Sequence, residues 1–102
     1  MSTQYYEGVG RRKTSTARVR VYPGGTGSVT INEKPGEEFL PREGDYTRAI
    51  EPLTALGVEK TYNVTVHVKG GGVTGQADAI CLGMARALVK INPDNRALLR
   101  AK

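Results

Sequence analysis

The stretch Lys69–Asn92, KGGGVTGQADAICLGMARALVKIN, decides the fold of this chain. Three consecutive glycines begin it, and after Gly75 apolar residues recur at spacings of three and four, as they do along one stripe of an α-helix. The stripe consists of Ala77, Ile80, Met84, Leu88 and Ile91. We predict a central buried helix with two cations, Arg86 and Lys90, on its exposed side.

The glycines before this helix predict a loop that can approach an anion closely. Residues without Cβ leave backbone N–H groups accessible, and the helix dipole adds partial positive charge at the same place. Gly70 and Gly75 have the spacing of a nucleotide-binding P-loop, but Gln76 and Ala77 stand where that motif needs Lys and Ser or Thr, which argues against a nucleoside triphosphatase. Two interpretations remain: a turn that only reverses the chain, and a turn that also meets the phosphates of a polyanion.

Two segments have the alternating pattern of half-buried strands. Residues 62–69 alternate valines with polar residues and end in Lys69 beside the glycines. Residues 11–20 hold five cations and no acid, and there Ala17, Val19 and Val21 alternate with Arg18, Arg20 and Tyr22. This period of two places the cations and the tyrosine together on one face of a strand.

The remaining segments complete the expected order of elements. A short strand is expected near residues 5–10, and the turn-rich residues 23–27 predict that residues 16–31 form a β-hairpin. Residues 35–46 are expected to form at most one helical turn. Asp45 is expected to cap either one kinked helix or two short helices divided at Pro52, and Asn92 to cap a last short helix. We predict an α+β fold, with one sheet and helices on one face, in a single domain over residues 1–102.

The distribution of charge favours a polyanionic partner. The chain of 102 residues carries a formal net charge of +5, but residues 33–59 hold seven of the ten acids and only three of the fifteen Lys and Arg residues. The rest of the chain is therefore strongly basic, as expected of a nucleic-acid-binding protein. A single cysteine and the lack of any long apolar segment favour an intracellular, soluble protein that does not bind membranes.

Catalytic and metal-binding interpretations find little support in the sequence. His67 and Cys81 could in principle form a thiolate pair, but Cys81 lies beside the apolar stripe and His67 on the polar side of its strand. One His and one Cys are too few soft ligands for zinc. We therefore expect no enzyme activity, no catalytic residue, no metal and no cofactor.

Four of these segments, taken together, resemble a known family. They are the GRRK start at residues 10–13, the ARV strand at 17–19, the GGG-x-x-GQ loop at 70–76 and the G-x-ARAL helix at 83–88. The chain resembles, from about Tyr5 to its last residue, the bacterial family of the ninth protein of the small ribosomal subunit. The resemblance implies a cytoplasmic, non-enzymatic protein bound to ribosomal RNA in the head of the subunit, beside other ribosomal proteins. It also implies a left-handed β-α-β crossover.

The resemblance and the charge pattern together give the expected RNA contacts. These are Arg11, Arg12, Lys13, Arg18, Arg20, Lys69, Gly70, Gly71, Gly72, Gln76, Arg86 and Lys90. Family members continue into a long basic tail that ends near the tRNA in the peptidyl site, whereas this sequence stops at Lys102. The tail is either absent or not included, so tRNA contact is expected only through that tail.

Two other functions remain open from the residues alone. A small α+β enzyme could use the glycine loop for a phosphate or a nucleotide, since a fold does not determine a function. A protein–protein adaptor could use the acidic segment 33–59.

Overall fold

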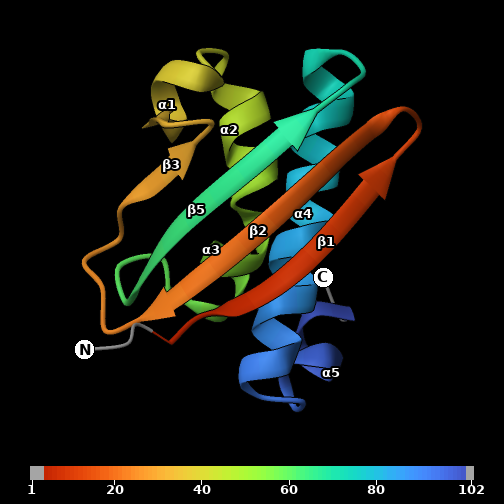
Figure 1. Cartoon of the computed structure of the whole chain (residues 1–102). Helices are drawn as coiled ribbons and strands as arrows, with labels where there is room; N and C mark the ends of the chain where they lie inside the picture. The colour runs from red at the N-terminus through yellow and green to blue at the C-terminus, as the bar shows by residue number, and fades with distance from the viewer. Residues whose placement is uncertain (1–3, 101–102) are drawn as a thin grey trace.

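The computed structural model describes residues 4–100, apart from the side chains of Glu43 and Arg100. Five strands form one sheet in the order β1-β2-β5-β3-β4, and the helices lie on one of its faces (Figure 1). The fold is therefore α+β, as the sequence predicts. The elements are β1 (Tyr6–Arg12), β2 (Ser15–Pro23), β3 (Val29–Ile31), β4 (Lys34–Pro35), α1 (Gly36–Phe39), α2 (Glu43–Ala49), α3 (Glu51–Leu56), β5 (Tyr62–Lys69), α4 (Val73–Ile91) and α5 (Asn95–Arg100).

The hairpin predicted for residues 16–31 is wrong. β5 lies between β2 and β3, antiparallel to β2 and parallel to β3, and β2 forms its hairpin with β1 instead. The side chain of Asn63 explains the difference, because its Oδ1 accepts hydrogen bonds from the backbone N–H groups of Thr26 and Ser28. These bonds hold the turn-rich segment against the start of β5, so that it forms a wide connection and no tight turn.

The connection from β3 to β5 is a left-handed crossover, as the family resemblance implies. In Figure 1 the helices lie behind the sheet, and both strands run upward with β5 to the right of β3. A crossover behind the sheet that reaches a strand on the right is left-handed, which is the uncommon hand for parallel neighbours. Helices α1, α2 and α3 all belong to this connection.

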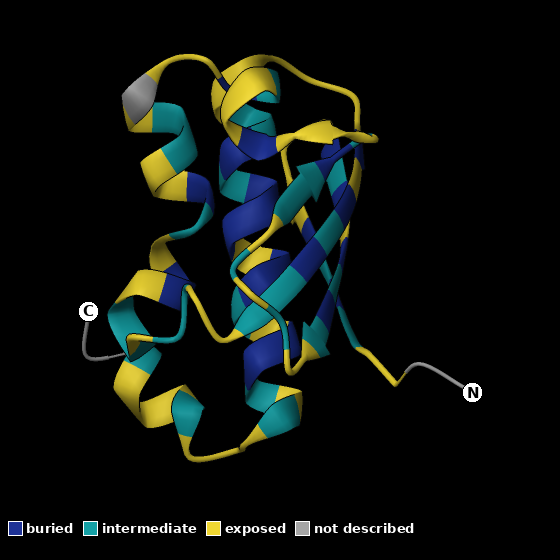
Figure 2. Ribbon diagram, turned by 90° about the vertical axis from the view of Figure 1, so that its left-hand side faces the viewer, coloured by how far each residue is buried: buried dark blue, intermediate teal, exposed yellow. Residues whose placement is uncertain are grey.

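Helix α4 is the centre of the core, as its apolar stripe predicts. Figure 2 shows the buried part of α4 between the sheet and the α2–α3 layer. The predicted stripe is buried from Ala77 to Leu88, and Ile91 at its end is half-buried. The inward sides of the two alternating strands are buried against it, namely Ala17, Val19 and Val21 in β2 and Val64, Val66 and Val68 in β5.

Glycines bring α4 unusually close to β1. A Cβ atom on Gly8 would overlap the carbonyl oxygen of Gly83, and a Cβ on Gly10 would overlap that of Ala79. On the helix side, a Cβ on Gly83 would lie 2.8 Å from a methyl group of Val19. Backbone therefore packs directly on backbone here, and side chains larger than hydrogen have no room.

The segment between β3 and β5 forms separate short helices. Helix α1 is the expected single turn, and it brings Leu40 into the core. Of the two arrangements expected around Pro52, the pair of short helices is correct, with Pro52 as the second residue of α3. Asp45 does not cap α2, because the helix begins earlier, at Glu43; the Asp45 carboxylate instead accepts a hydrogen bond from Arg42. Asn92 lies three residues before the first residue of α5, and its side-chain oxygen accepts a bond from the N–H of Asp94.

Candidate nucleic-acid interface

The predicted contact residues fall on three surfaces of the molecule. The first is the open face, the side of the sheet that carries no helix, with Arg11, Arg18, Arg20 and Lys69. The second is the loop end, where the β1–β2 turn meets the glycines before α4, with Arg12, Lys13, Gly70, Gly71, Gly72 and Gln76. The third is the α4–α5 groove, with Arg86 and Lys90.

Strand register determines how the open face is arranged. Directly paired residues of neighbouring antiparallel strands lie on the same side of a sheet. Arg11 pairs with Thr16 and Thr16 with Lys69, so these three form one row across β1, β2 and β5. In the next row Arg18 pairs with His67. Cations from three strands are therefore displayed side by side on a surface that the ladder holds rigid.

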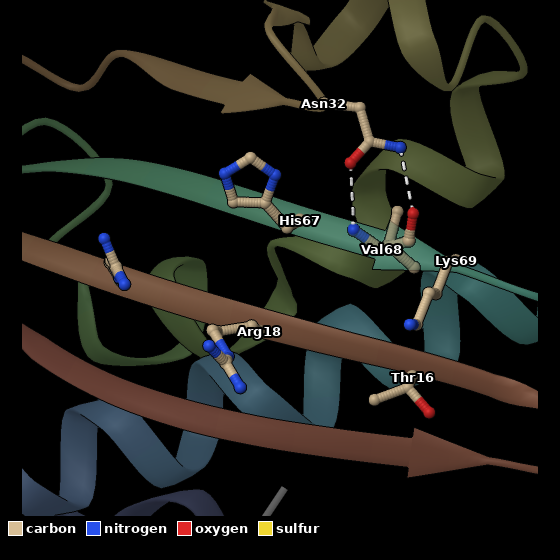
Figure 3. Close-up of a pocket in the computed structure, with 7 residues that line it drawn as sticks. Thr16, Arg18, Asn32, His67, Val68 and Lys69 are labelled. Carbon is tan, nitrogen blue, oxygen red and sulfur yellow. Dashed lines mark hydrogen bonds between the residues drawn. The ribbon is translucent and has the colours of Figure 1, made fainter.

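A shallow hollow of about 520 Å³ lies on the open face. Its residues are Thr16, Arg18, Arg20, Asn32, His67, Val68 and Lys69 (Figure 3). The Asn32 side chain closes one side, because its Oδ1 accepts from the Val68 N–H and its Nδ2 donates to the Val68 carbonyl, both at 2.9 Å. Asn32 thus continues the ladder past the end of β3 and fixes the wall of the hollow.

The sequence did not predict the partners of the two arginines in β2. Glu7 pairs with Arg20 across the hairpin, and its carboxylate accepts a hydrogen bond from Arg20 Nε at 3.0 Å. Arg18 Nε lies 3.8 Å from the same carboxylate. The hydrogen bond to Glu7 is the main reason that the pKa of Arg20 is raised. The acid-free run of residues 11–20 therefore faces an acid from β1, which only the register of the hairpin could have revealed.

Two tyrosines also lie on the open face. The rings of Tyr5 and Tyr22 have centroids 5.5 Å apart, and the Arg20 guanidinium lies over the Tyr5 ring at 4.7 Å. The sequence predicted the outward position of Tyr22 but not its neighbour, because Tyr5 precedes the first strand. Tyr5 is 43% exposed, although large aromatic side chains in folded proteins are usually more deeply buried.

At the loop end the glycines serve a structural purpose. Gly70 and Gly71 have positive φ angles of 82° and 66°, and a Cβ on either would overlap Thr14 or Ser15. The Gly70 carbonyl accepts bonds from buried Ser15 Oγ at 2.9 Å and from Gln76 Nε2 at 3.2 Å. The Gln76 side chain therefore stabilises the loop through its hydrogen bond to the Gly70 carbonyl. The glycines therefore make the chain reversal that both interpretations include, and phosphate binding stays a prediction.

The charge at the loop end is partly neutralised. A hollow of about 200 Å³ lies between the β1–β2 turn and the start of α4, and Arg12, Lys13 and Gly72 contribute to its walls. Asp78, which the sequence did not single out, also lines it, and lies 3.8 Å from Arg12 Nε and 3.0 Å from Arg48 Nε. An anion at this end would meet a carboxylate, as it would beside Arg18 and Arg20 on the open face. The open face is the stronger candidate because two of its cations, Arg11 and Lys69, form no ion pair within the described residues.

The third surface is a groove of about 470 Å³ between α4 and α5. Arg86 crosses to the edge of the sheet, where its Nη1 donates to the Val9 carbonyl at 2.6 Å. Lys90 and Arg96 are exposed on the rim. One hydrogen-bond donor of Arg86 is therefore already used by a backbone carbonyl on the free edge of β1.

The structure separates the residues of the other sites considered. His67 is exposed on the open face, while Cys81 is buried on α4 at the other side of the sheet, where burial raises the pKa of its thiol. Within residues 4–100 no group of three or more His, Cys, Asp or Glu side chains could hold a metal ion. Among the described helices, none has the length and apolar character needed to cross a membrane.

Comparison with known proteins decides the family. A model of the family described as ribosomal protein S9/S16 matches residues 10–102. The chain belongs to this family. A relative from Gloeothece citriformis, named small ribosomal subunit protein uS9, is 53% identical over 98 residues, which cover 95% of this chain and 71% of the relative. Similar values hold for uS9c of Gracilaria tenuistipitata, at 52% identity, and for uS9 of Synechocystis, at 50%, with the same coverage of both chains.

Proposed function

We propose that this chain is a structural, non-enzymatic component of the small ribosomal subunit that binds ribosomal RNA as one domain. The observation that carries the proposal is its membership of the S9/S16 family, with relatives named as proteins of that subunit. Its place would be in the cytoplasm, on the ribosome, beside neighbouring ribosomal proteins. We assign no tRNA contact to the residues described here, because the family resemblance places that contact in a basic tail after the position of Lys102.

The open face is the main RNA-binding surface in this proposal. Arg11, Arg18 and Lys69 project from three strands whose other side is buried on α4, so the fold fixes the separations of their Cα atoms. Most protein contacts to RNA backbones are charge-assisted bonds to phosphates, and each one releases counterions. On a rigid sheet only the side chains of the cations must be ordered on binding, whereas a flexible tail must also order its backbone, which favours the sheet as the docking surface.

The other two surfaces contribute less in this proposal. At the loop end Arg12 already has Asp78 beside it, and in the α4–α5 groove Arg86 already donates to the Val9 carbonyl. Lys13 and Lys90 are exposed, and no ion pair involves either side chain in the part of the chain described. We expect the two lysines to add nonspecific attraction and the open face to determine the docking geometry.

Salt dependence of RNA binding tests the proposal. Binding of a small-subunit ribosomal RNA fragment is measured by filter retention over a range of salt concentrations for the unaltered chain and for Arg11→Ala and Lys69→Ala. Each substitution should weaken binding and lower the slope of log affinity against log salt by about one. Arg12→Ala should lower it less, because Asp78 already offsets that charge.

Arg42 provides the matched control. Its side chain is well exposed, but it belongs to the acidic segment and pairs with Asp45. Arg42→Ala removes the same charge from the chain, so its slope should stay that of the unaltered protein. Equal losses in Arg42→Ala and Arg11→Ala would mean that net charge alone drives binding, and would contradict a defined RNA-binding surface.

A further inference from the structure

We propose that the open face binds unpaired RNA nucleotides, with a base stacked on the tyrosine pair Tyr5 and Tyr22 and the adjoining phosphates on the cations of β2 and β5. This inference rests on the proposed function and adds the class of RNA to it. The observation behind it is that one exposed and one half-buried aromatic ring share one helix-free face of the sheet with the cations of β2 and β5.

The tyrosine pair forms a platform at one end of the open face. Arg20 is held in two ways, by its bond to Glu7 at 3.0 Å and by its position 4.7 Å over the Tyr5 ring. A guanidinium over a ring adds a cation–π contact, and because the two rings are inclined by 49°, a base can stack on one ring and touch the other. Because the Glu7 carboxylate accepts from Arg20 Nε and offsets the charge of the guanidinium, we expect this arginine to contribute more to stacking than to phosphate binding.

The phosphate-binding end lies at the opposite side of the hollow. Tyr22 is six positions after Thr16 along β2, and Thr16 pairs with Lys69. At the usual rise per residue, Tyr22 and Thr16 are therefore about 20 Å apart. Arg18 lies between them, beside His67, with its side chain 58% exposed. From Tyr22 through Arg18 to Lys69, the open face thus presents first an aromatic ring and then cations. This is the order that a single strand of about four nucleotides requires.

Glu7 makes the surface selective. Along β1, β2 and β5, it is the one acid among the residues that alternate onto the open face. It lies beside Arg20 and the tyrosines and 3.8 Å from Arg18, but away from Lys69, so it repels phosphates most where bases should stack and least at the Lys69 end. An RNA duplex offers phosphates on its outside and no free base faces, so it can satisfy the cations but not the tyrosines.

Two oligonucleotides and three variants test this inference. Fluorescence anisotropy at low salt compares a labelled single-stranded RNA of about eight nucleotides with a duplex of the same length. The single strand should bind more tightly. Tyr22→Leu keeps the bulk but removes the ring, and should weaken single-strand binding about fivefold or more without changing the salt slope. Tyr22→Phe keeps the ring and should bind like the unaltered chain. Arg18→Ala should lower the salt slope, by less than the value of about 0.7 for an unpaired cation, because Glu7 lies 3.8 Å from Arg18.

The outcomes separate this inference from the proposed function. If the unaltered chain binds no RNA of either kind at low salt, the proposed function fails and the inference fails with it. If RNA binds with a salt slope that Arg18→Ala lowers, but Tyr22→Leu behaves like Tyr22→Phe or the duplex binds as tightly, RNA binding stands and stacking is overturned. Thermal melts show whether Tyr22→Leu is folded; Tyr5→Leu, at a more exposed ring before β1, gives the same comparison independently.

Discussion

At the scale of single residues, two adjacent residues differ in how well they tolerate a left-handed backbone conformation. Asn32 and Glu33 form the turn between β3 and β4, with positive φ angles of 50° and 68°. Asparagine tolerates this left-handed region, and here its side chain also bonds both backbone groups of Val68. Glutamate has no such tolerance, and no hydrogen bond of the described chain involves its side chain. The turn therefore carries strain at its second position.

Glu33→Gly should stabilise the protein. Glycine adopts the left-handed conformation without the steric cost that glutamate meets, and Asn-Gly is the favoured pair in two-residue turns of this kind. We expect the free energy of unfolding to rise by about 1 kcal/mol, as measured by urea denaturation. Glu33→Gln keeps the strain and removes the charge, so it should leave stability nearly unchanged. The same gain in both variants would show that charge, and not backbone strain, limits this turn.

At the scale of elements, the contact between β1 and α4 depends on glycines, which have no side chain. Gly8 and Gly10 let the strand approach the helix until backbone meets backbone, and Gly83 does the same from the helix side. Neither an apolar stripe nor an alternating pattern contains this information. The sequence predicts a short strand near residues 5–10 in which Gly8 and Gly10 would allow a bend or bulge, but glycine offers no side chain from which to predict a packed face.

Gly10→Ala should destabilise the fold strongly. A Cβ there would overlap the Ala79 carbonyl, and neither backbone can move without separating α4 from the sheet. Overpacking of this kind costs about 1–3 kcal/mol or more. Gly44→Ala is the matched control, since Gly44 lies in α2 with open space around it, and there alanine should stabilise by about 0.4–1 kcal/mol. Thermal denaturation of both variants measures the difference; equal melting temperatures would contradict the close approach.

The fold could be predicted where side chains alternate or repeat, and not where the chain reverses. β2, β5 and α4 follow from the spacing of Val19, Val66 and Met84 and their neighbours. The hairpin of residues 16–31 was wrong because Pro23 and the glycines after it fit a tight turn and a wide connection equally well. The cations of the candidate site were found by composition, but Glu7 and Asp78 beside them come from other elements, and only the folded register brings them close.

At the scale of the whole molecule, the sheet is unevenly supported. β2 and β5 are central strands with neighbours on both sides and α4 beneath, whereas β4 has two residues and a single neighbour. The acidic segment 33–59 begins at this weak edge and includes the short helices of the crossover. The three surfaces with cations lie instead around β2, β5 and α4. Rigidity and positive charge therefore coincide, as the proposed function requires.

Hydrogen exchange should reproduce this division. Backbone amides of β2, β5 and α4 should exchange slowest, near the rate set by global unfolding, because they open only when the core opens. Amides of β4 and α1 should exchange much faster, through local opening of the sheet edge. Two-dimensional NMR in deuterated buffer resolves these groups. Uniform protection from β1 to α5 would show that the edge and the centre unfold as one unit.

The tight seam between β1 and α4 also has a consequence for how the chain is made. A growing polypeptide emerges from its N-terminus, so the strand of the seam leaves the exit tunnel long before its helix does. Until Ile91 is clear, the β1–β2 hairpin has no helix to cover its apolar side. The order of synthesis thus delays completion of the domain until α4 has emerged, and for that interval the valines of β2 remain accessible to chaperones.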